Sequence, residues 1–221
     1  MAKKVNILAF DTSASACSVA LSFNGKIDVI HQVAPMQQAT LILSHIQSLL
    51  DRANTSLTQL DAVAYGRGPG SFTGIRIASS VAQGMGFGLN LPLLPISSLA
   101  VLAQAAFNTH QWRSLFVLLD GRANHVYSAY YEVNGNGYIE QVGKENFEKI
   151  DQLIMPSIEP WYGVGDGWQK YKNSLDQQGY RPLDYDISPL FQAESMIKIA
   201  TIQLQQGRQV SAAAALPLYL R

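Results

Sequence analysis

Two aspartates stand where they could hold a metal ion and the phosphates of a nucleotide. Asp11 follows the short apolar run 5–10, and Asp120 follows the similar run 115–119. A carboxylate at the end of a buried strand can coordinate Mg²⁺ or orient a water molecule. The residues that follow each aspartate are bulkier than a working phosphate hairpin requires, and the turn 163–167 resembles what is left of an adenosine loop. These patterns predict a degenerate nucleotide site made of Asp11, Thr12, Ser13, Asp120, Gly121 and Gly165.

A glycine-rich segment over residues 66–71 offers a second candidate phosphate site, because it runs directly into a helix. Helix N-termini bind anions, but a Walker loop also needs a lysine after its last glycine. Here Gly70 is followed by Ser71 and Phe72. The favoured interpretation is a rigid corner that positions the helix, with Ser71 as its N-cap. This structural turn consists of Gly66, Gly68, Pro69, Gly70 and Ser71.

Other residue types give little support for catalysis. Gly84, Gly86 and Gly88 imitate a dinucleotide fingerprint, but they lie toward the C-terminus of a helix, where the dipole repels phosphate. The four histidines do not show the spacing of a helical metal site. The single cysteine, Cys17, is expected to lie in the core. The sequence therefore predicts no catalytic residue and no metal site.

The elements that must position these residues follow the same order twice. Up to residue 107 the expected order is strand, aspartate, hairpin, helix, strand and helix, and the same order starts again at residue 115. In this second half the first helix is expected near 147–155. This duplication predicts an α/β protein of two lobes with mixed sheets flanked by helices. The expected lobes are 1–108 and 109–221, and the last helix, over about 193–207, is one that could pack back on the N-terminal lobe.

Two helices, over about 37–53 and 71–88, lack the charged face that a water-exposed helix normally shows. Residues 37–50 include no formal charge, and residues 71–90 include only Arg76. Helical spacing places one apolar arc of each helix toward the core, including Ala39 and Leu43 on the first helix. The remaining sides favour contact with another protein, although burial within one fold is the plain alternative. The predicted interface residues are Leu41, His45, Phe72, Arg76, Ser79, Gln83, Gly86 and Phe87.

The composition limits the classes of partner. The 221 residues carry 16 basic and 16 acidic side chains, so the formal net charge is zero. Without a basic tract the chain is not expected to bind nucleic acid alone, and 48% hydrophobic against 14% charged residues favours association with protein. The sequence shows neither a signal peptide nor a run of membrane-spanning length, so a cytoplasmic protein is expected.

Three segments together resemble the TsaB (YeaZ) family closely and in the right order. They are ILAFDTSASACSVAL, AYGRGPGSFTGIRIASSVAQG and the terminal LPLYLR, and the similarity extends over nearly the whole chain. The resemblance implies an actin-like ATPase fold (the ASKHA, ribonuclease H-like class) that has lost catalysis. It also implies a role in forming threonylcarbamoyladenosine (t6A) at position 37 of tRNAs that read codons beginning with A.

The resemblance further implies a set of partners. A non-catalytic subunit of this kind binds the catalytic paralogue TsaD through the two helices, is joined by the small ATPase TsaE, and forms a homodimer when alone. No cofactor is then required by this chain, since ATP and metal are expected on TsaD, and tRNA is contacted only indirectly. Two alternatives stay open on the sequence: an independent ATPase or small-molecule kinase, and a self-associating structural protein.

Overall fold

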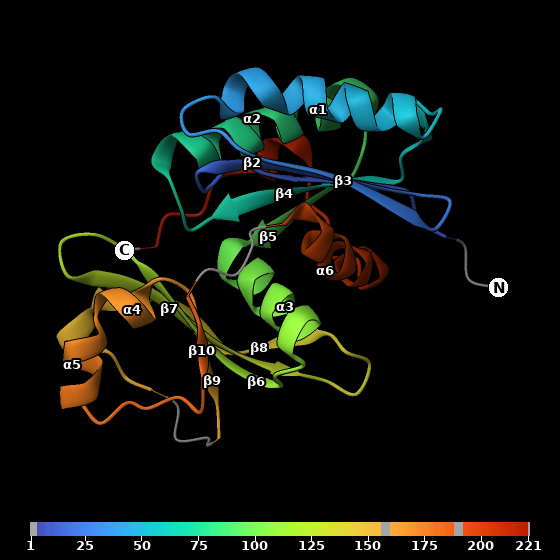
Figure 1. Ribbon diagram of the computed structural model, residues 1–221. Coiled ribbons are helices and arrows are strands. Elements are labelled where there is room, and N and C mark those ends of the chain that lie inside the picture. The colour runs from blue at the N-terminus through green and yellow to red at the C-terminus, as the bar shows by residue number, and fades with distance from the viewer. Residues whose placement is uncertain (1–3, 156–159, 188–191, 221) are drawn as a thin grey trace. The chain divides into compact units, whose positions relative to one another are not determined.

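The computed structural model describes residues 4–155, 160–187 and 192–220, which form two units, each built on a five-stranded sheet (Figure 1). The first sheet has the order β3-β2-β1-β4-β5. Strand β1 pairs antiparallel with β2 and parallel with β4, so the sheet is mixed. Its strands are β1 (Ile7–Asp11), β2 (Ala16–Phe23), β3 (Lys26–Val33), β4 (Ala62–Gly68) and β5 (Leu93–Ser97).

The second sheet repeats this topology. Its order is β10-β9-β6-β7-β8, in which β6 pairs antiparallel with β7 and parallel with β9, as β1 does with β2 and β4. The predicted duplication of a mixed α/β unit is therefore confirmed. The strands are β6 (Ser114–Asp120), β7 (His125–Val133), β8 (Ile139–Lys149), β9 (Tyr162–Val164) and β10 (Tyr185–Asp186).

Alternating residues of the first sheet face two separate apolar cores. Leu8 and Phe10 of β1 pack beneath helices α1 (Gln38–Arg52) and α2 (Phe72–Leu89). Ile7 and Ala9 point to the other face, where they meet α6 (Ala193–Gln205). Figure 1 shows α1 and α2 side by side on one face of this sheet and α6 on the other. Strands β1, β2, β4 and β5 are therefore mostly buried on both faces, which explains their apolar character, whereas the edge strand β3 is exposed or half-buried.

The remaining helices are shorter or belong to the second unit. They are α3 (Ser98–His110), α4 (Gly167–Lys170), α5 (Lys172–Gln177) and the short 3₁₀ turns Leu57–Gln59, Ile150–Gln152 and Ala212–Ala214. In the described ranges, no helix is both long and apolar enough to cross a membrane. The Cys17 side chain is buried, as predicted, and burial together with the nearby Asp11 raises the pKa of its thiol to about 11, which disfavours the reactive thiolate.

The boundaries of the two units differ from the predicted lobes. The first unit comprises Met1–Val101 with Phe191–Leu218, and the second comprises Leu102–Leu190 with Tyr219–Arg221. The expected division at residue 108 therefore falls inside the second unit. The last helix belongs to the first unit, because Met196 and Ala200 of α6 pack against its sheet.

One predicted element was wrong. The helix expected near 147–155 is replaced by the end of β8 and the 3₁₀ turn Ile150–Gln152. Phe147 pairs across the sheet with Tyr127 of β7, and its ring lies 4.8 Å from the Tyr127 ring and 5.0 Å from that of His125. Such cross-strand aromatic contacts stabilise strand pairing, and they override the local helical pattern.

Candidate functional site

The glycine-rich turn packs directly onto the loop that follows β1. The hydroxyl of Thr12 donates to the carbonyl of Gly74 at 2.7 Å, and the Ser71 N–H donates to the carbonyl of Ser13 at 2.7 Å. Ser71 also caps α2, as predicted, because its hydroxyl oxygen accepts from the Gly74 N–H at 3.4 Å. The structure thus brings the predicted turn and the predicted remnant Asp11–Ser13 together.

Glycine is required for this close approach. A Cβ at Gly66 would overlap the Asp11 carboxylate, and one at Gly74 would overlap the Thr12 carbonyl. At Gly70 it would lie 2.7 Å from Ser13. Gly68 serves another purpose, since its φ of +97° is one that L side chains rarely adopt. Gly66 and Gly68 belong to β4 itself, so the turn begins later than the sequence suggested.

The packing of the glycine-rich turn against the β1–β2 loop buries Asp11. Its side chain is 2% exposed, and its Oδ1 accepts from both the N–H and the hydroxyl of Ser13, each at 2.7 Å. The Ser13 hydroxyl lies in turn 3.1 Å from that of Ser98. Within the described ranges, Oδ2 has no hydrogen-bond partner. Burial raises the pKa of Asp11 and outweighs the lowering by Ser13, which favours a neutral carboxylic acid over a metal-binding carboxylate.

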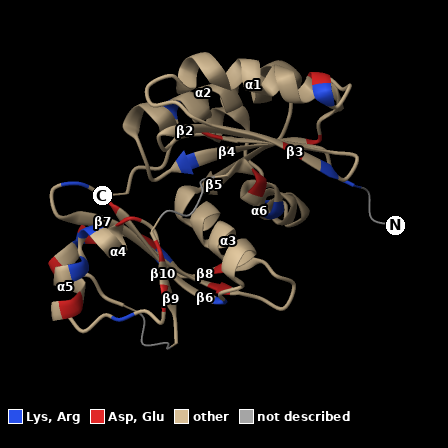
Figure 2. Cartoon of the chain, in the orientation of Figure 1, with Lys and Arg blue, Asp and Glu red and all other residues tan. Residues whose placement is uncertain are grey.

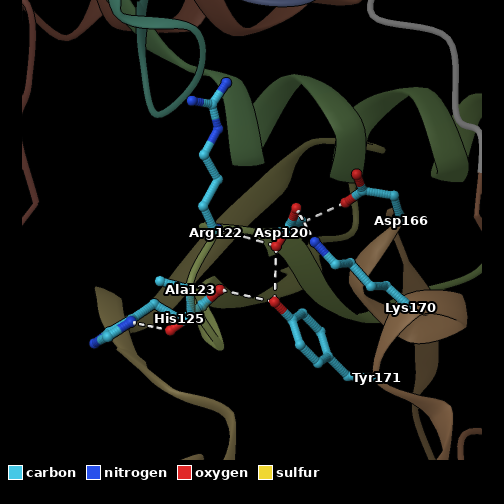
Figure 3. A network of polar contacts seen from close by, with 7 residues as sticks. All are labelled: Asp120, Arg122, Ala123, His125, Asp166, Lys170 and Tyr171. Carbon is cyan, nitrogen blue, oxygen red and sulfur yellow. Dashed lines mark hydrogen bonds and ion pairs between the residues drawn. The ribbon is translucent and has the colours of Figure 1, made fainter.

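Asp120, in the second unit, is engaged by three donors (Figure 3). Its carboxylate accepts from the Tyr171 hydroxyl at 2.8 Å and the Arg122 N–H at 3.0 Å, and forms an ion pair with Lys170. Its own N–H donates to Asp166 at 2.9 Å. Partial burial raises the pKa of Asp120, but the hydrogen bonds from Lys170, Tyr171 and Arg122 bring it below its usual value. Asp120 is therefore charged but already has partners.

The two other predicted remnant residues permit tight packing beside this network. A Cβ at Gly165, whose φ is +105°, would lie 2.5 Å from the Leu118 carbonyl. A Cβ at Gly121 would lie 2.7 Å from the Phe147 ring. Within the described ranges, no three His, Cys, Asp or Glu side chains gather to form a candidate metal site.

Exposed apolar side chains lie on the charge-poor helices α1 and α2 and, at Met36, just before α1. The exposed fraction is 97% for Met36, 58% for Leu43, 59% for Phe72 and 87% for Phe87. Figure 2 shows that both helices are almost free of charged residues. We call this surface the α1–α2 outer face, defined by the exposed residues Ala39, Thr40, Leu43, Ser44, Phe72, Thr73, Arg76, Ser80, Gly84 and Phe87.

Several helix positions face differently from the prediction. Ala39 and Leu43, expected in the core, are exposed, whereas His45, Ser79 and Gly86, expected in the interface, are buried. Leu41 and Gln83 are only partly exposed. The reason lies in small contacts that helical periodicity does not reveal. The Ser79 hydroxyl donates to the Ile75 carbonyl, and α2 approaches β5 so closely that a Cβ at Gly86 would lie 2.8 Å from Leu93.

Two exposed positions, Phe72 and Arg76, form a stacked pair on α2. The guanidinium carbon of Arg76 lies 3.6 Å from the centre of the Phe72 ring, which is a cation–π geometry.

A groove of about 630 Å³ adjoins Phe87 at the other end of α2. It is lined by Gly86, Phe87, Asn90, Leu91, Pro92 and residues 209–213. The sequence did not indicate Met36 as an exposed site residue. It did not indicate the groove either, because residues 209–213, which line one side of it, are far from α2 in the sequence.

The burial of His45 leads to a pH-dependent prediction. Its side chain is 9% exposed, and within the described ranges its Nε2 has no partner. Burial lowers its pKa from the usual 6.5, so the folded state binds fewer protons than the unfolded state. The stabilisation from neutral His45 is therefore complete above about pH 6.5 and is lost as the pH falls through the folded-state value.

We expect His45→Gln to weaken this dependence. Urea unfolding at about pH 7.5 and about pH 5.5 should show a smaller loss of stability for the variant than for the parent chain. The same measurement between about pH 7.5 and about pH 8.5 is the control, since no change from His45 is expected there. An equal loss at acid pH in both proteins would contradict the assignment.

Comparisons with known proteins agree with this architecture. The family model described as TsaD, tRNA N6-adenosine threonylcarbamoyltransferase, matches residues 29–213. The chain is 36% identical to the tRNA threonylcarbamoyladenosine biosynthesis protein TsaB of Escherichia coli (98% of this chain, 95% of the relative). It is 33% identical to the Haemophilus influenzae protein of the same name (99% and 94%).

A solved structure gives the same result. YeaZ from Pseudomonas aeruginosa superposes with a TM-score of 0.92 at 37% identity, and the alignment covers 98% of this chain and all of that one. The predicted actin-like ATPase fold is confirmed by this match and by the family model. With similarity over nearly the full length of both curated relatives, the chain belongs to the TsaB (YeaZ) family and carries a domain of the TsaD type.

Proposed function

We propose that this protein acts in t6A biosynthesis as a non-catalytic subunit that binds and activates the catalytic paralogue TsaD through the α1–α2 outer face. Participation in t6A biosynthesis is supported by the names of its TsaB relatives. The observation that carries the binding role is the charge-poor surface on which Leu43, Phe72 and Phe87 are each more than half exposed. Large exposed apolar side chains that are grouped on one surface are typical of protein interfaces.

The state of the two aspartates supports the non-catalytic part of the proposal. Asp11 is buried under the glycine-rich turn, with Ser13 occupying one carboxylate oxygen. Asp120 is bound by Lys170, Tyr171 and the backbone of Arg122. A metal ion or a nucleotide-bound water would have to displace the packing of Gly66 against the Asp11 carboxylate, or the donors that already engage Asp120.

The same proposal places the nucleotide chemistry elsewhere in the assembly. ATP and the metal ion are held by TsaD, the small ATPase TsaE joins the complex, and the chain forms a homodimer through the same face when TsaD is absent. The reaction takes place in the cytoplasm. Since the chain has no net charge, TsaD supplies most of the contact with tRNA.

Reconstitution of t6A formation tests the proposal. We expect TsaD, TsaE, ATP, a preformed activated threonylcarbamoyl donor and tRNA to give modified tRNA only when this chain is added. The chain alone, with Mg²⁺ and ATP, should show no ATP hydrolysis above background. Asp11→Asn, which keeps the shape of the side chain, should support t6A formation as well as the parent chain does.

Two results would count against a non-catalytic subunit. One is ATP turnover by the purified chain that Asp11→Asn abolishes, which would favour an independent ATPase. The other is a loss of t6A formation with Asp11→Asn while its affinity for TsaD, measured by calorimetry, stays unchanged. Full modification activity without this chain would contradict the activating role itself.

A further inference from the structure

The turn between β6 and β7 holds three successive residues in the left-handed region. The φ angles are +67° for Arg122, +48° for Ala123 and +61° for Asn124. Asparagine tolerates this conformation, but arginine and alanine adopt it only at a cost in free energy. Glycine would relieve the cost at position 122. An arginine in such a place therefore indicates that its side chain is needed there.

A dense set of hydrogen bonds holds the turn in this conformation. The Arg122 N–H donates to Asp120, and the Arg122 carbonyl accepts from the His125 N–H at 2.9 Å. The Asn124 carbonyl accepts from the Ile150 N–H at 2.9 Å, which ties the turn to the end of β8. Asp120 is itself fixed by Tyr171 and Lys170 (Figure 3). The backbone of Arg122 is thus rigidly placed.

The side chain of Arg122 takes no part in this network. Figure 3 shows it extended away from Asp120, and the residue is exposed. Within the described ranges, its guanidinium has no hydrogen bond or ion pair. Two lysines lie near the turn. Lys170 forms an ion pair with Asp120, and the exposed Lys149 of β8 lies opposite His125 of β7. Exposed acids also adjoin the turn: Asp166 accepts from the Asp120 N–H, and Asp151 follows Ile150, which binds the Asn124 carbonyl. Among the described residues around the turn, acids therefore alternate with the exposed cations, and the turn does not carry a broad basic patch.

We propose that Arg122 contacts a phosphate of the tRNA backbone while the tRNA is bound to the assembly. A guanidinium forms paired hydrogen bonds with phosphate oxygens, and a fixed backbone lowers the entropy lost on binding. The names of the relatives make tRNA the polyanion that this family encounters. A carboxylate of a protein partner is the competing ligand, and the experiment separates the two. In this proposal TsaD holds most of the tRNA and Arg122 adds one direct contact. The proposal therefore rests on the proposed function, in which this chain binds TsaD.

The test measures binding of unmodified tRNA to the complex of this chain with TsaD at about 50 to about 200 mM salt. We expect Arg122→Gln to weaken binding about 5-fold and to reduce the slope of log K against log salt concentration by about 0.7 to 0.9, the value for one phosphate. Arg122→Lys should keep most of the slope. Arg181→Gln, at another exposed arginine of the second unit, is the matched control and should change neither quantity.

Arg122→Gly separates a binding role from a structural one. Because glycine accepts a φ of +67°, this variant should raise the melting temperature while it weakens tRNA binding as Arg122→Gln does. Unchanged tRNA affinity and salt slope in both variants would overturn the proposal. So would a loss of affinity for TsaD in calorimetry without tRNA, since it would assign Arg122 to a protein carboxylate. If the parent chain does not bind TsaD, the proposed function fails and the proposal for Arg122 fails with it. If the complex forms and binds tRNA, but the salt slope of Arg122→Gln equals that of the parent chain, the Arg122 contact alone fails.

Discussion

Phe87→Asp is expected to weaken the complex with TsaD by at least about 30-fold, the effect of losing a hot spot worth about 2 kcal/mol. Phe87 is 87% exposed and forms part of the wall of the groove beside residues 209–213. The fold of the monomer should tolerate the change, because an exposed aspartate costs little in water, although the homodimer proposed through the same face should weaken as well. In the complex the carboxylate would be buried without a partner, which is costly. Calorimetry with purified TsaD measures the affinity directly.

Leu183→Asp is the matched control for this prediction. Leu183 is also exposed, at 63%, but it belongs to the second unit and lies outside the α1–α2 outer face. Its substitution should leave the affinity for TsaD unchanged. Leu43→Asp, on α1, should act in the same direction as Phe87→Asp. If both outer-face variants bind TsaD as tightly as the parent chain, the interface lies elsewhere.

Gly74→Ala should cause the largest loss of stability, about 3 kcal/mol or more. The new methyl group would overlap the backbone carbonyl of Thr12, which no side-chain rotation can move. Relief requires α2 to shift away from the β1–β2 loop and to weaken the hydrogen bond from the Thr12 hydroxyl to the Gly74 carbonyl. For a chain of this size the melting temperature should fall by about 6 °C or more.

Gly84→Ala is the opposite case on the same helix. Within the described ranges, a Cβ at Gly84 meets nothing within 4 Å. Because alanine is the better helix former, this variant should gain about 0.8 to 1 kcal/mol. Urea unfolding of both variants beside the parent chain gives the comparison. Similar destabilisation by the two substitutions would show that helix propensity, rather than the contact with Thr12, controls the result.

The sequence predicted the duplicated architecture because each half carries its own complete pattern. Apolar runs that end at Asp11 and Asp120, each followed by a hairpin signal, are local features that the sheets preserve. The cap at Ser71 was predictable for the same reason. The helix expected near 147–155 was wrong, because pairing of Phe147 with Tyr127 is a contact across the sheet that local periodicity does not contain.

The candidate surfaces were predicted less well than the fold. The lack of charged residues identified α1 and α2 as unusual, but helical spacing placed Ser79 and Gly86 outside and Leu43 inside. Small residues carry little hydrophobic signal, so the position of the neighbouring β5 decides which side of α2 is covered. The partners of Asp120 were equally hidden, since Lys170 and Tyr171 are some fifty positions away in the chain.

The return of α6 to the first sheet has a consequence for synthesis on the ribosome. Leu93 of β5 exchanges backbone hydrogen bonds with Val210, and Met196 fills the core on one face of that sheet. The unit that is translated first therefore stays incomplete until nearly the whole polypeptide has emerged. The second unit is inserted within the first and has most of its residues available earlier. The sheet of the second unit can therefore form while the face of the first sheet that α6 will cover is still exposed. A chaperone would be needed during this interval.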